Sequence, residues 1–232
     1  MLLTIAPPFW PKMPPIGIGY LQAFLTNNNI KCSILDLNNI FYNLASSKLK
    51  KSWLVSCNTF LEENIFSLMQ KNHPEEFKSL VDKMLEYKII GFSCFKSNMH
   101  STLKLAKLLK FRNKNIRIIF GGPEMTREYF KKSGNIKGLA DFTVIGEGEK
   151  PLLKFVQLYS TSRAGLNLPC SCYFSELDTL KELPFPVYKG IVLNSYPRKN
   201  TLPILFSRGC IRKCRFCSEA LLYKKFRVRP LK

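Results

Sequence analysis

The sequence predicts an α/β fold: a doubly wound sheet of five parallel strands with helices on both faces, a helical insertion, and the start of a second domain. Short apolar runs of strand length alternate with segments in which apolar residues recur at helical spacing. Glycine-containing turns follow the third, fourth and fifth runs, as they do where ligands meet the carboxyl edge of a parallel sheet. The 232 residues are 46% hydrophobic and 22% charged, which is a globular composition and argues against disorder.

The first strand–helix–strand unit occupies the N-terminal part of the chain. Residues 2–6 form an apolar run that ends at two prolines, which predicts a buried strand followed by a loop. Residues 17–27 carry apolar side chains at near-helical spacing, and residues 30–37 form a second apolar run. This order predicts the start of a βαβ fold. Residues 40–87 show two helical patterns over a length too great for a loop, so we expect a helical insertion there.

The alternation of strands and helices resumes after the insertion. Each remaining strand is a short apolar run and each helix has an amphipathic pattern, so we expect a parallel sheet with crossover helices. The expected strands are residues 89–95, 116–120 and 142–145, and the expected helices are residues 101–111, 125–132 and 151–159.

Three stretches of the chain differ in composition. Residues 1–160 contain the five expected strands, so we expect them to form one α/β domain. Residues 161–200 are proline-rich and weakly periodic, which indicates a linker with short strand pieces. Residues 201–232 begin with an apolar run at 202–206, which predicts a new strand and the first piece of a second domain. Without a partner, that strand would be an exposed edge prone to aggregation.

The charge balance is strongly basic. Lys and Arg total 36 against 16 Asp and Glu, and the net charge of +20 raises nucleic acid or a membrane surface as a partner. The lysines are scattered, which weakens that argument, although residues 207–232 carry nine basic residues and a single acid. No apolar stretch is long enough to span a membrane, and the N-terminus lacks the pattern of a signal peptide. We therefore expect a cytoplasmic protein, with neither a membrane nor nucleic acid favoured as partner.

Three cysteines near the end of the sequence form a C-x3-C-x2-C motif. Cys210, Cys214 and Cys217 lie within eight residues, so their thiolates can surround one small inorganic centre. Structural zinc sites usually take four protein ligands, and no fourth cysteine or histidine lies nearby in the sequence. Three thiolates suit a [4Fe–4S] cluster with one iron left open for chemistry. A structural zinc site that borrows one cysteine of the C-x-C pair at residues 170–172 is the alternative.

Residues 207–219 read Ser-Arg-Gly-Cys-Ile-Arg-Lys-Cys-Arg-Phe-Cys-Ser-Glu, and this stretch resembles the cluster loop of the radical S-adenosylmethionine (radical SAM) superfamily. The aromatic Phe216 before the third cysteine belongs to the same pattern. The resemblance implies that Cys210, Cys214 and Cys217 ligate a [4Fe–4S] cluster, and that Phe216 belongs to the cofactor site. It also implies that S-adenosylmethionine chelates the open iron and is cleaved by one electron to a radical that abstracts hydrogen from a substrate.

Glycine-containing turns at the ends of three successive strands carry a second resemblance. They are Gly91-Phe92-Ser93-Cys94-Phe95, Gly121-Gly122-Pro123-Glu124 and Gly146-Glu147-Gly148-Glu149. Such glycines let the backbone approach a flat ligand at the carboxyl edge of the sheet. The set resembles the cobalamin (B12)-binding domain that precedes many radical SAM domains. The resemblance implies that Ser93, Gly121 and Gly122 contact cobalamin, with Ser93 hydrogen-bonded to its nucleotide tail.

Two features of this region leave alternatives open. Cobalamin domains that ligate cobalt from below carry D-x-H-x-x-G after the first strand, whereas residues 7–13 read Pro-Pro-Phe-Trp-Pro-Lys-Met. A bound cobalamin would therefore lack a protein imidazole ligand, as it does in many radical SAM relatives. Glu147 and Glu149 fit either a ligand site or the favourable end of a helix dipole.

The resemblance implies a protein larger than this chain. A radical SAM barrel has about six βα units, roughly 190 residues when scaled from an eight-unit barrel, and only its first piece is present. We expect a fragment, a frame-shifted product or half of a split enzyme, inactive alone and completed by an adjacent polypeptide. The resemblance implies methyl transfer, an electron donor such as flavodoxin or ferredoxin, and a small-molecule or peptide substrate. The alternative is a nucleic-acid-binding module with a structural zinc knuckle, in which the basic residues are Arg212, Lys213, Arg215 and Lys224.

Overall fold

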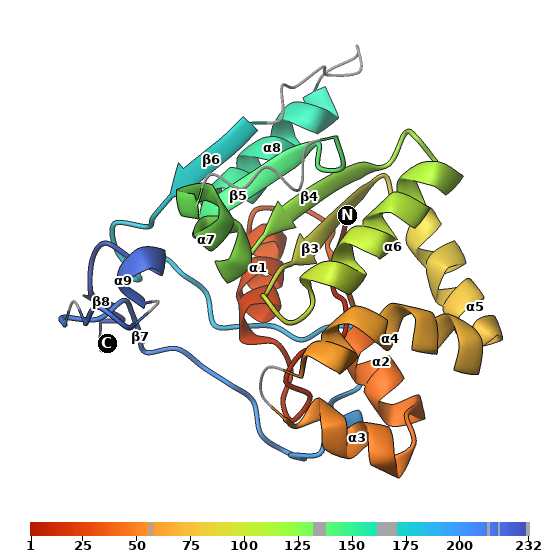
Figure 1. Ribbon diagram of the computed structural model, residues 1–232. Coiled ribbons are helices and arrows are strands. Elements are labelled where there is room, and N and C mark those ends of the chain that lie inside the picture. Colours follow the sequence, from red (N-terminus) through yellow and green to blue (C-terminus); the bar gives the residue numbers. More distant parts are fainter. Residues whose placement is uncertain (56–57, 132–137, 162–170, 213, 218, 231–232) are drawn as a thin grey trace.

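The computed structural model describes all residues except 56–57, 132–137, 162–170, 213, 218 and 231–232. Its centre is one parallel sheet with the strand order β2-β1-β3-β4-β5-β6 (Figure 1). All five strands expected from the sequence are present, which confirms the α/β fold class. The strands are β1 (Leu2–Ile5), β2 (Ser33–Asp36), β3 (Ile89–Ser93), β4 (Arg117–Gly121), β5 (Phe142–Gly146) and β6 (Ser171–Ser175).

The sixth strand, β6, adds to the sheet that the sequence predicts. It lies in the segment expected to be a linker with short strand pieces, and it pairs in parallel with β5. Phe142 lies opposite Ser171 and Gly146 opposite Ser175. Because β6 covers the edge that β5 would otherwise expose, the domain includes residues beyond the last expected helix.

Helices cover both faces of the sheet, because successive side chains of a strand point to opposite sides. Leu3 of β1 belongs to an apolar cluster with Ile18 and Phe155, from the helices of one face. Its neighbour Leu2 belongs to a second cluster with Leu105, from the helices of the other face. No helix in the described part of the chain is long and apolar enough to cross a membrane. The helices on the first face are α1 (Ile16–Asn27) and α8 (Glu149–Thr161), and the others before β6 are α2 (Leu37–Leu44), α3 (Ser47–Trp53), α4 (Thr59–Asn72), α5 (Pro74–Leu85), α6 (Met99–Arg112) and α7 (Pro123–Lys131).

The expected helical insertion consists of α2 to α5, between β2 and β3. Phe66 of α4 and Phe77 of α5 pack edge to face, with ring centroids 5.3 Å apart. Both rings belong to the cluster that contains Leu2 and Leu105, so the insertion shares its core with one face of the sheet.

After β6 the chain crosses to the other side of the domain as an irregular connecting segment, residues 176–206, which includes the 3₁₀ helix η1 (Leu193–Ser195) (Figure 1). The side-chain amide of Gln22 donates to the Lys189 carbonyl and accepts from its N–H, each at 2.9 Å. The Tyr196 hydroxyl donates to Asp36 at the end of β2. Burial raises the pKa of Asp36 to about 6, although Tyr196 and backbone N–H groups stabilise its charged form.

The last described part of the chain is a small antiparallel hairpin, residues 207–230, called the C-terminal hairpin below. The expectation of a strand at residues 202–206 is wrong, because these residues form no ladder. Pro203 has no N–H to donate, and the Tyr20 hydroxyl binds both the backbone N–H and the carbonyl of Leu205, at 3.0 and 3.2 Å. The elements of the hairpin are β7 (Ser207–Arg208), α9 (Glu219–Leu222) and β8 (Arg227–Val228).

Candidate functional site

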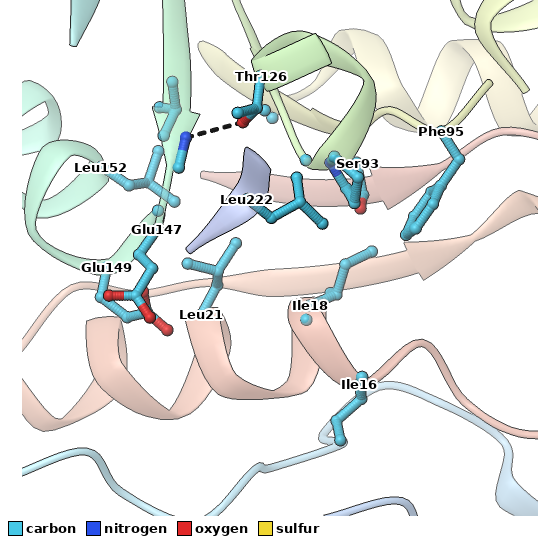
Figure 2. Close-up of a pocket in the computed structure, with 18 of the residues that line it drawn as sticks. Ile16, Ile18, Leu21, Ser93, Phe95, Thr126, Glu147, Glu149, Leu152 and Leu222 are labelled. Carbon is cyan, nitrogen blue, oxygen red and sulfur yellow. Dashed lines mark hydrogen bonds between the residues drawn. The ribbon is translucent and has the colours of Figure 1, made fainter. Parts of the chain in front are cut away.

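A cavity of about 290 Å³ opens at the carboxyl edge of the sheet, where β3, β4 and β5 end opposite α1 and α8. We call it the edge cavity. Figure 2 shows apolar side chains facing it, among them Ile18 and Leu21 of α1 and Leu222 of α9. Its size is at the low end for small-molecule pockets, which hold about 300–1,000 Å³ and combine apolar walls with a few polar groups.

The structure brings together the three cobalamin-site residues predicted from the sequence. Ser93 ends β3, Gly121 ends β4, Gly122 follows it, and all three line the edge cavity. Gly91, in the middle of β3, lines it as well, and a Cβ there would lie 3.0 Å from a methyl group of Leu3. At Gly121 a Cβ would meet only Val144, at 3.5 Å, so this position has room for a larger side chain.

Gly122 is required by the way the loops after β3 and β4 meet. Its φ is +101°, a conformation that L side chains rarely adopt, and a Cβ would lie 2.7 Å from the Cys94 carbonyl oxygen. The Cys94 N–H donates to Gly121 at 2.7 Å, and the Glu124 N–H donates to Cys94 at 3.1 Å. These contacts fix the wall of the cavity at the predicted glycines.

Asn98 holds the neighbouring loops and was missed in the sequence. Its buried side chain donates to the carbonyls of Ala6 and Ser93, at 3.1 and 3.0 Å, and accepts from the Phe95 N–H at 2.8 Å. The Phe95 ring lines the cavity and packs on Phe9, with centroids 4.4 Å apart. An Asn directly before a helix usually signals a cap, but this one bonds the loops and makes no cap hydrogen bond.

Two carboxylates at the start of α8 pair with arginines of the C-terminal hairpin. Glu147 contacts Arg208 at 2.9 Å and Arg227 at 2.8 Å, and Glu149 contacts Arg208 at 2.6 Å. Arg227 also lies 3.2 Å from Glu176, which follows β6. We call these five residues the Glu–Arg cluster. The sequence left open whether the two glutamates serve a site or the helix dipole, and the structure gives them long-range partners.

The Glu–Arg cluster is removed from water. The side chains of Arg208 and Arg227 are each 6% exposed, and those of Glu147 and Glu149 are 2% and 3% exposed. Burial alone lowers the pKa of Arg208, but the carboxylates of Glu149 and Glu147 outweigh it and raise that pKa, so Arg208 stays charged. Among the described residues, Oε2 of Glu149 is a buried oxygen without a hydrogen-bond partner.

The cysteine loop, residues 209–218, follows Arg208 directly. Cys210 is exposed, Cys214 and Cys217 are half-buried, and none of the three forms a disulfide. Among the described residues, no three Cys, His, Asp or Glu side chains lie close enough together to hold a metal. Phe216 is 94% exposed and does not line the edge cavity. The structure therefore does not bring the predicted cluster ligands together, and their role stays a prediction.

The alternative zinc site cannot be placed on this structure. Cys170 lies outside the described residues, and for Cys172 only its position in β6 is described. Cys94 is a poor metal ligand, because burial in apolar surroundings raises the pKa of its thiol far above the ordinary value.

Comparison with known proteins finds a family match for part of the wall of the edge cavity. Residues 53–156 match the family model "B12 binding domain". This part of the chain is therefore similar to a B12-binding domain. The match covers β3, β4 and β5, whose carboxyl ends form the cavity, together with the Gly-Glu-Gly-Glu turn that starts α8.

The relatives found for this chain are methyltransferases. It is 26% identical over 159 residues to "Uncharacterized methyltransferase PH0819" of Pyrococcus horikoshii, which covers 62% of this chain and 34% of the relative. The structure of this chain resembles that of the radical S-adenosylmethionine methyltransferase TsrM from Kitasatospora setae with cobalamin and a [4Fe–4S] cluster bound. The TM-score is 0.55 and the sequence identity is 12%. That alignment covers 99% of this chain and 43% of TsrM.

At 12% identity the likeness to TsrM shows the fold alone. This chain spans about a third of the Pyrococcus methyltransferase and less than half of TsrM, so the activity of a whole enzyme is a proposal. Neither the family match nor these relatives support the nucleic-acid-binding alternative.

Proposed function

We propose that this chain binds cobalamin at the edge cavity and a [4Fe–4S] cluster through Cys210, Cys214 and Cys217, as the cobalamin-binding part of a radical SAM methyltransferase. The observation that carries the proposal is the edge cavity, an apolar pocket whose wall lies partly in the segment that matches the B12 binding domain. The predicted glycines Gly121, at the end of β4, and Gly122, directly after it, belong to that part of the wall. Methyl transfer is proposed because the relatives are named methyltransferases.

The residues present fit one end of a cobalamin. A cavity of about 290 Å³ is too small for a whole corrin ring, but it suits a flat aromatic base attached to a sugar phosphate. Ile18 and Leu21 offer apolar contact to such a base, and the absent side chain of Gly121 leaves room for it, because a Cβ there would meet only Val144, at 3.5 Å. Ser93 brings a hydroxyl to the cavity wall, where it can bond the polar tail.

The donor set of the cysteine loop fits an iron–sulfur cluster. Cys210, Cys214 and Cys217 are free thiols that are exposed or half-buried, and thiolates are the ligands that such clusters take. When bound, the cluster supplies an open iron and an electron for cleaving S-adenosylmethionine, and cobalamin supplies a methyl carrier. In this proposal Phe216 covers the cluster, a ferredoxin- or flavodoxin-type protein donates the electron, and further polypeptide completes the barrel around a small-molecule or peptide substrate.

A graded substitution at Gly121 tests the cobalamin site. A Cβ at Gly121 would lie 3.5 Å from Val144, which is ordinary contact, so Gly121→Ala should fold and bind normally. Gly121→Leu should fill the cavity and weaken hydroxocobalamin binding at least tenfold in equilibrium dialysis. Equal binding by both variants and the native chain, or no binding by the native chain, would contradict the proposed site.

Anaerobic reconstitution with iron and sulfide tests the cluster. The native chain should acquire about four irons and the broad brown absorbance of a [4Fe–4S] cluster. Cys214→Ala should lose that absorbance. Cys32→Ala should keep it, because Cys32 lies directly before β2, far in the sequence from the cysteine loop, and burial raises the pKa of its thiol to about 12. Stoichiometric zinc in place of iron would favour the structural zinc site.

A further inference from the structure

The buried charges of the Glu–Arg cluster join the C-terminal hairpin to the α/β domain. Arg208 of β7 and Arg227 of β8 both reach Glu147, so the two strands of the hairpin share one carboxylate of the domain. The cluster holds three carboxylates and two guanidinium groups, and the pairs with Glu147 and Glu149 have exposures of 6% or less. Figure 1 shows the hairpin beside α7, at the edge where β5 ends.

Stability alone is a weak explanation for such a cluster. Removing charges from water costs free energy that their attraction often fails to recover, and apolar side chains of similar volume frequently do as well. Buried charges do, however, tolerate few alternative arrangements, because each unpaired charge is heavily penalised. The cluster therefore points to a requirement for one particular position of the hairpin.

Both ends of the cysteine loop are held by this arrangement. Gly209, between Arg208 and Cys210, has φ +79°, and a Cβ there would overlap the Lys225 carbonyl oxygen. The first cysteine is therefore two residues from a buried anchor, across a position with no room for a side chain. Beyond the loop, Glu176 accepts the N–H groups of Lys224 and Lys225, at 2.9 and 3.0 Å.

The same residues form part of the wall of the edge cavity. Glu147, Glu149 and Arg208 line it, as do Leu222 and Tyr223 of the hairpin. A ligand in the cavity would thus contact the α/β domain and the hairpin together. Figure 2 shows the two glutamates and Leu222 around the same space as Ser93.

We propose that Arg208, Glu147 and Glu149 are positioning residues, which hold the cysteine loop at the mouth of the edge cavity and couple docking of the C-terminal hairpin to occupation of the cavity. The coupling to a cofactor rests on the proposed function, whereas the docking itself does not. A ligand that contacts both parts stabilises the docked hairpin, and by linkage the docked hairpin strengthens the binding of the ligand to the same degree.

Hydrogen–deuterium exchange of the full chain without cofactors tests the docking. In Arg208→Gln, backbone amides of residues 205–229 should exchange at least tenfold faster than in the native chain, while amides of β3, β4 and β5 keep their rates. Glu149→Gln should have a smaller effect in the same residues. The matched control is Asp178→Asn, because Asp178 pairs with Lys225 of the same hairpin at 3.6 Å but is exposed to solvent.

Two results would overturn the docking role. One is exchange in Arg208→Gln and Glu149→Gln equal to that in Asp178→Asn. The other is faster exchange throughout the sheet in both variants, which would make the cluster a general stabilising feature rather than a positioning one.

Titration with hydroxocobalamin tests the coupling separately. Arg208→Gln should bind it at least tenfold more weakly than the native chain, and bound hydroxocobalamin should slow exchange at residues 205–229 of the native chain. Unchanged affinity in Arg208→Gln would overturn the coupling. No binding by the native chain would instead remove the proposed function and the coupling, and leave the docking result to stand on the exchange data.

Discussion

The α/β domain and the C-terminal hairpin are held in place by different forces. Apolar side chains in two layers, one on each face of the sheet, hold the domain, and residues such as Ile90, Leu109 and Phe120 are fully buried there. The hairpin has two-residue strands and several exposed apolar side chains, including Phe226 and Val228. Its buried side chains include Arg208 and Arg227, which form ion pairs with carboxylates of the domain.

This difference affects how each part responds to change. Apolar burial is non-directional and distributed over many contacts, so a layer adapts to moderate changes of shape. An ion-pair cluster depends on a few groups with fixed geometry, and removal of one partner leaves another charge buried alone. The domain is therefore suited to provide a rigid cavity, and the hairpin to take up one defined position beside it.

The largest effect is expected from the core of the domain. Phe120→Ala should lower the free energy of unfolding by about 3–5 kcal/mol, because the ring of Phe120 is fully buried between sheet and helices. Urea denaturation followed by circular dichroism measures this change. Phe111→Ala is the control, since Phe111 is 84% exposed at the end of α6 and should change stability little. Similar losses in both variants would mean that apolar layers do not dominate the domain.

A smaller and local effect is expected from the Glu–Arg cluster. Glu147→Gln should weaken the attachment of the hairpin to the domain by about 3 kcal/mol, because two buried arginines lose their shared carboxylate. The loss should fall on the hairpin, so trypsin should cleave residues 207–230 faster while the urea midpoint of the domain changes little. A parallel fall in the urea midpoint would show that the two parts unfold together and would remove the contrast drawn above.

Asp36, at the end of β2 and bound by Tyr196 of the connecting segment, should make the free energy of unfolding depend on pH. Its pKa is raised to about 6 in the fold from an ordinary value of 3.8, so the folded state binds a proton more tightly than the unfolded one. The contribution of Asp36 to the free energy of unfolding is greatest below about pH 4 and is lost as the pH rises through 6, a total of about 3 kcal/mol. In urea titrations between pH 4.5 and 7.5, Asp36→Asn should remove this fall in the free energy of unfolding. Asp82→Asn should still show it, because Asp82 is an exposed residue of α5.

The smallest effect is expected at the surface of the hairpin. Asp178→Asn removes an exposed ion pair with Lys225 and should change stability by less than about 0.5 kcal/mol. Any change should disappear in high salt, where exposed charges are screened. A larger effect would extend the electrostatic attachment of the hairpin beyond its buried cluster.

The sheet and half of the cavity could be predicted because they depend on local patterns. Apolar runs and helical spacing located five strands and their helices, and the ends of parallel strands placed Ser93, Gly121 and Gly122 at one edge. The sixth strand, Ser-Cys-Tyr-Phe-Ser, lies where the sequence predicts short strand pieces, but nothing in the sequence indicated that it pairs with β5.

No local sequence pattern indicated the contacts between residues that are far apart in the sequence. Glu147 and Arg208 are 61 residues apart, and charges carry no periodicity that could relate them. Asn98 looked like an ordinary residue before a helix, and its three loop contacts depend on where the chain folds back. The strand expected at 202–206 failed for a similar reason, since Tyr20 of α1 takes up the backbone groups that a ladder would use.

The path of the connecting segment decides where a shortened gene for this protein can stop. A product ending at residue 160 would keep every strand first identified in the sequence, yet it would leave the β5 edge bare. It would also strip the buried amide of Gln22 and the carboxylate of Asp36 of their partners, Lys189 and Tyr196. Expression of a minimal version for crystallisation or dialysis should therefore extend past Tyr196.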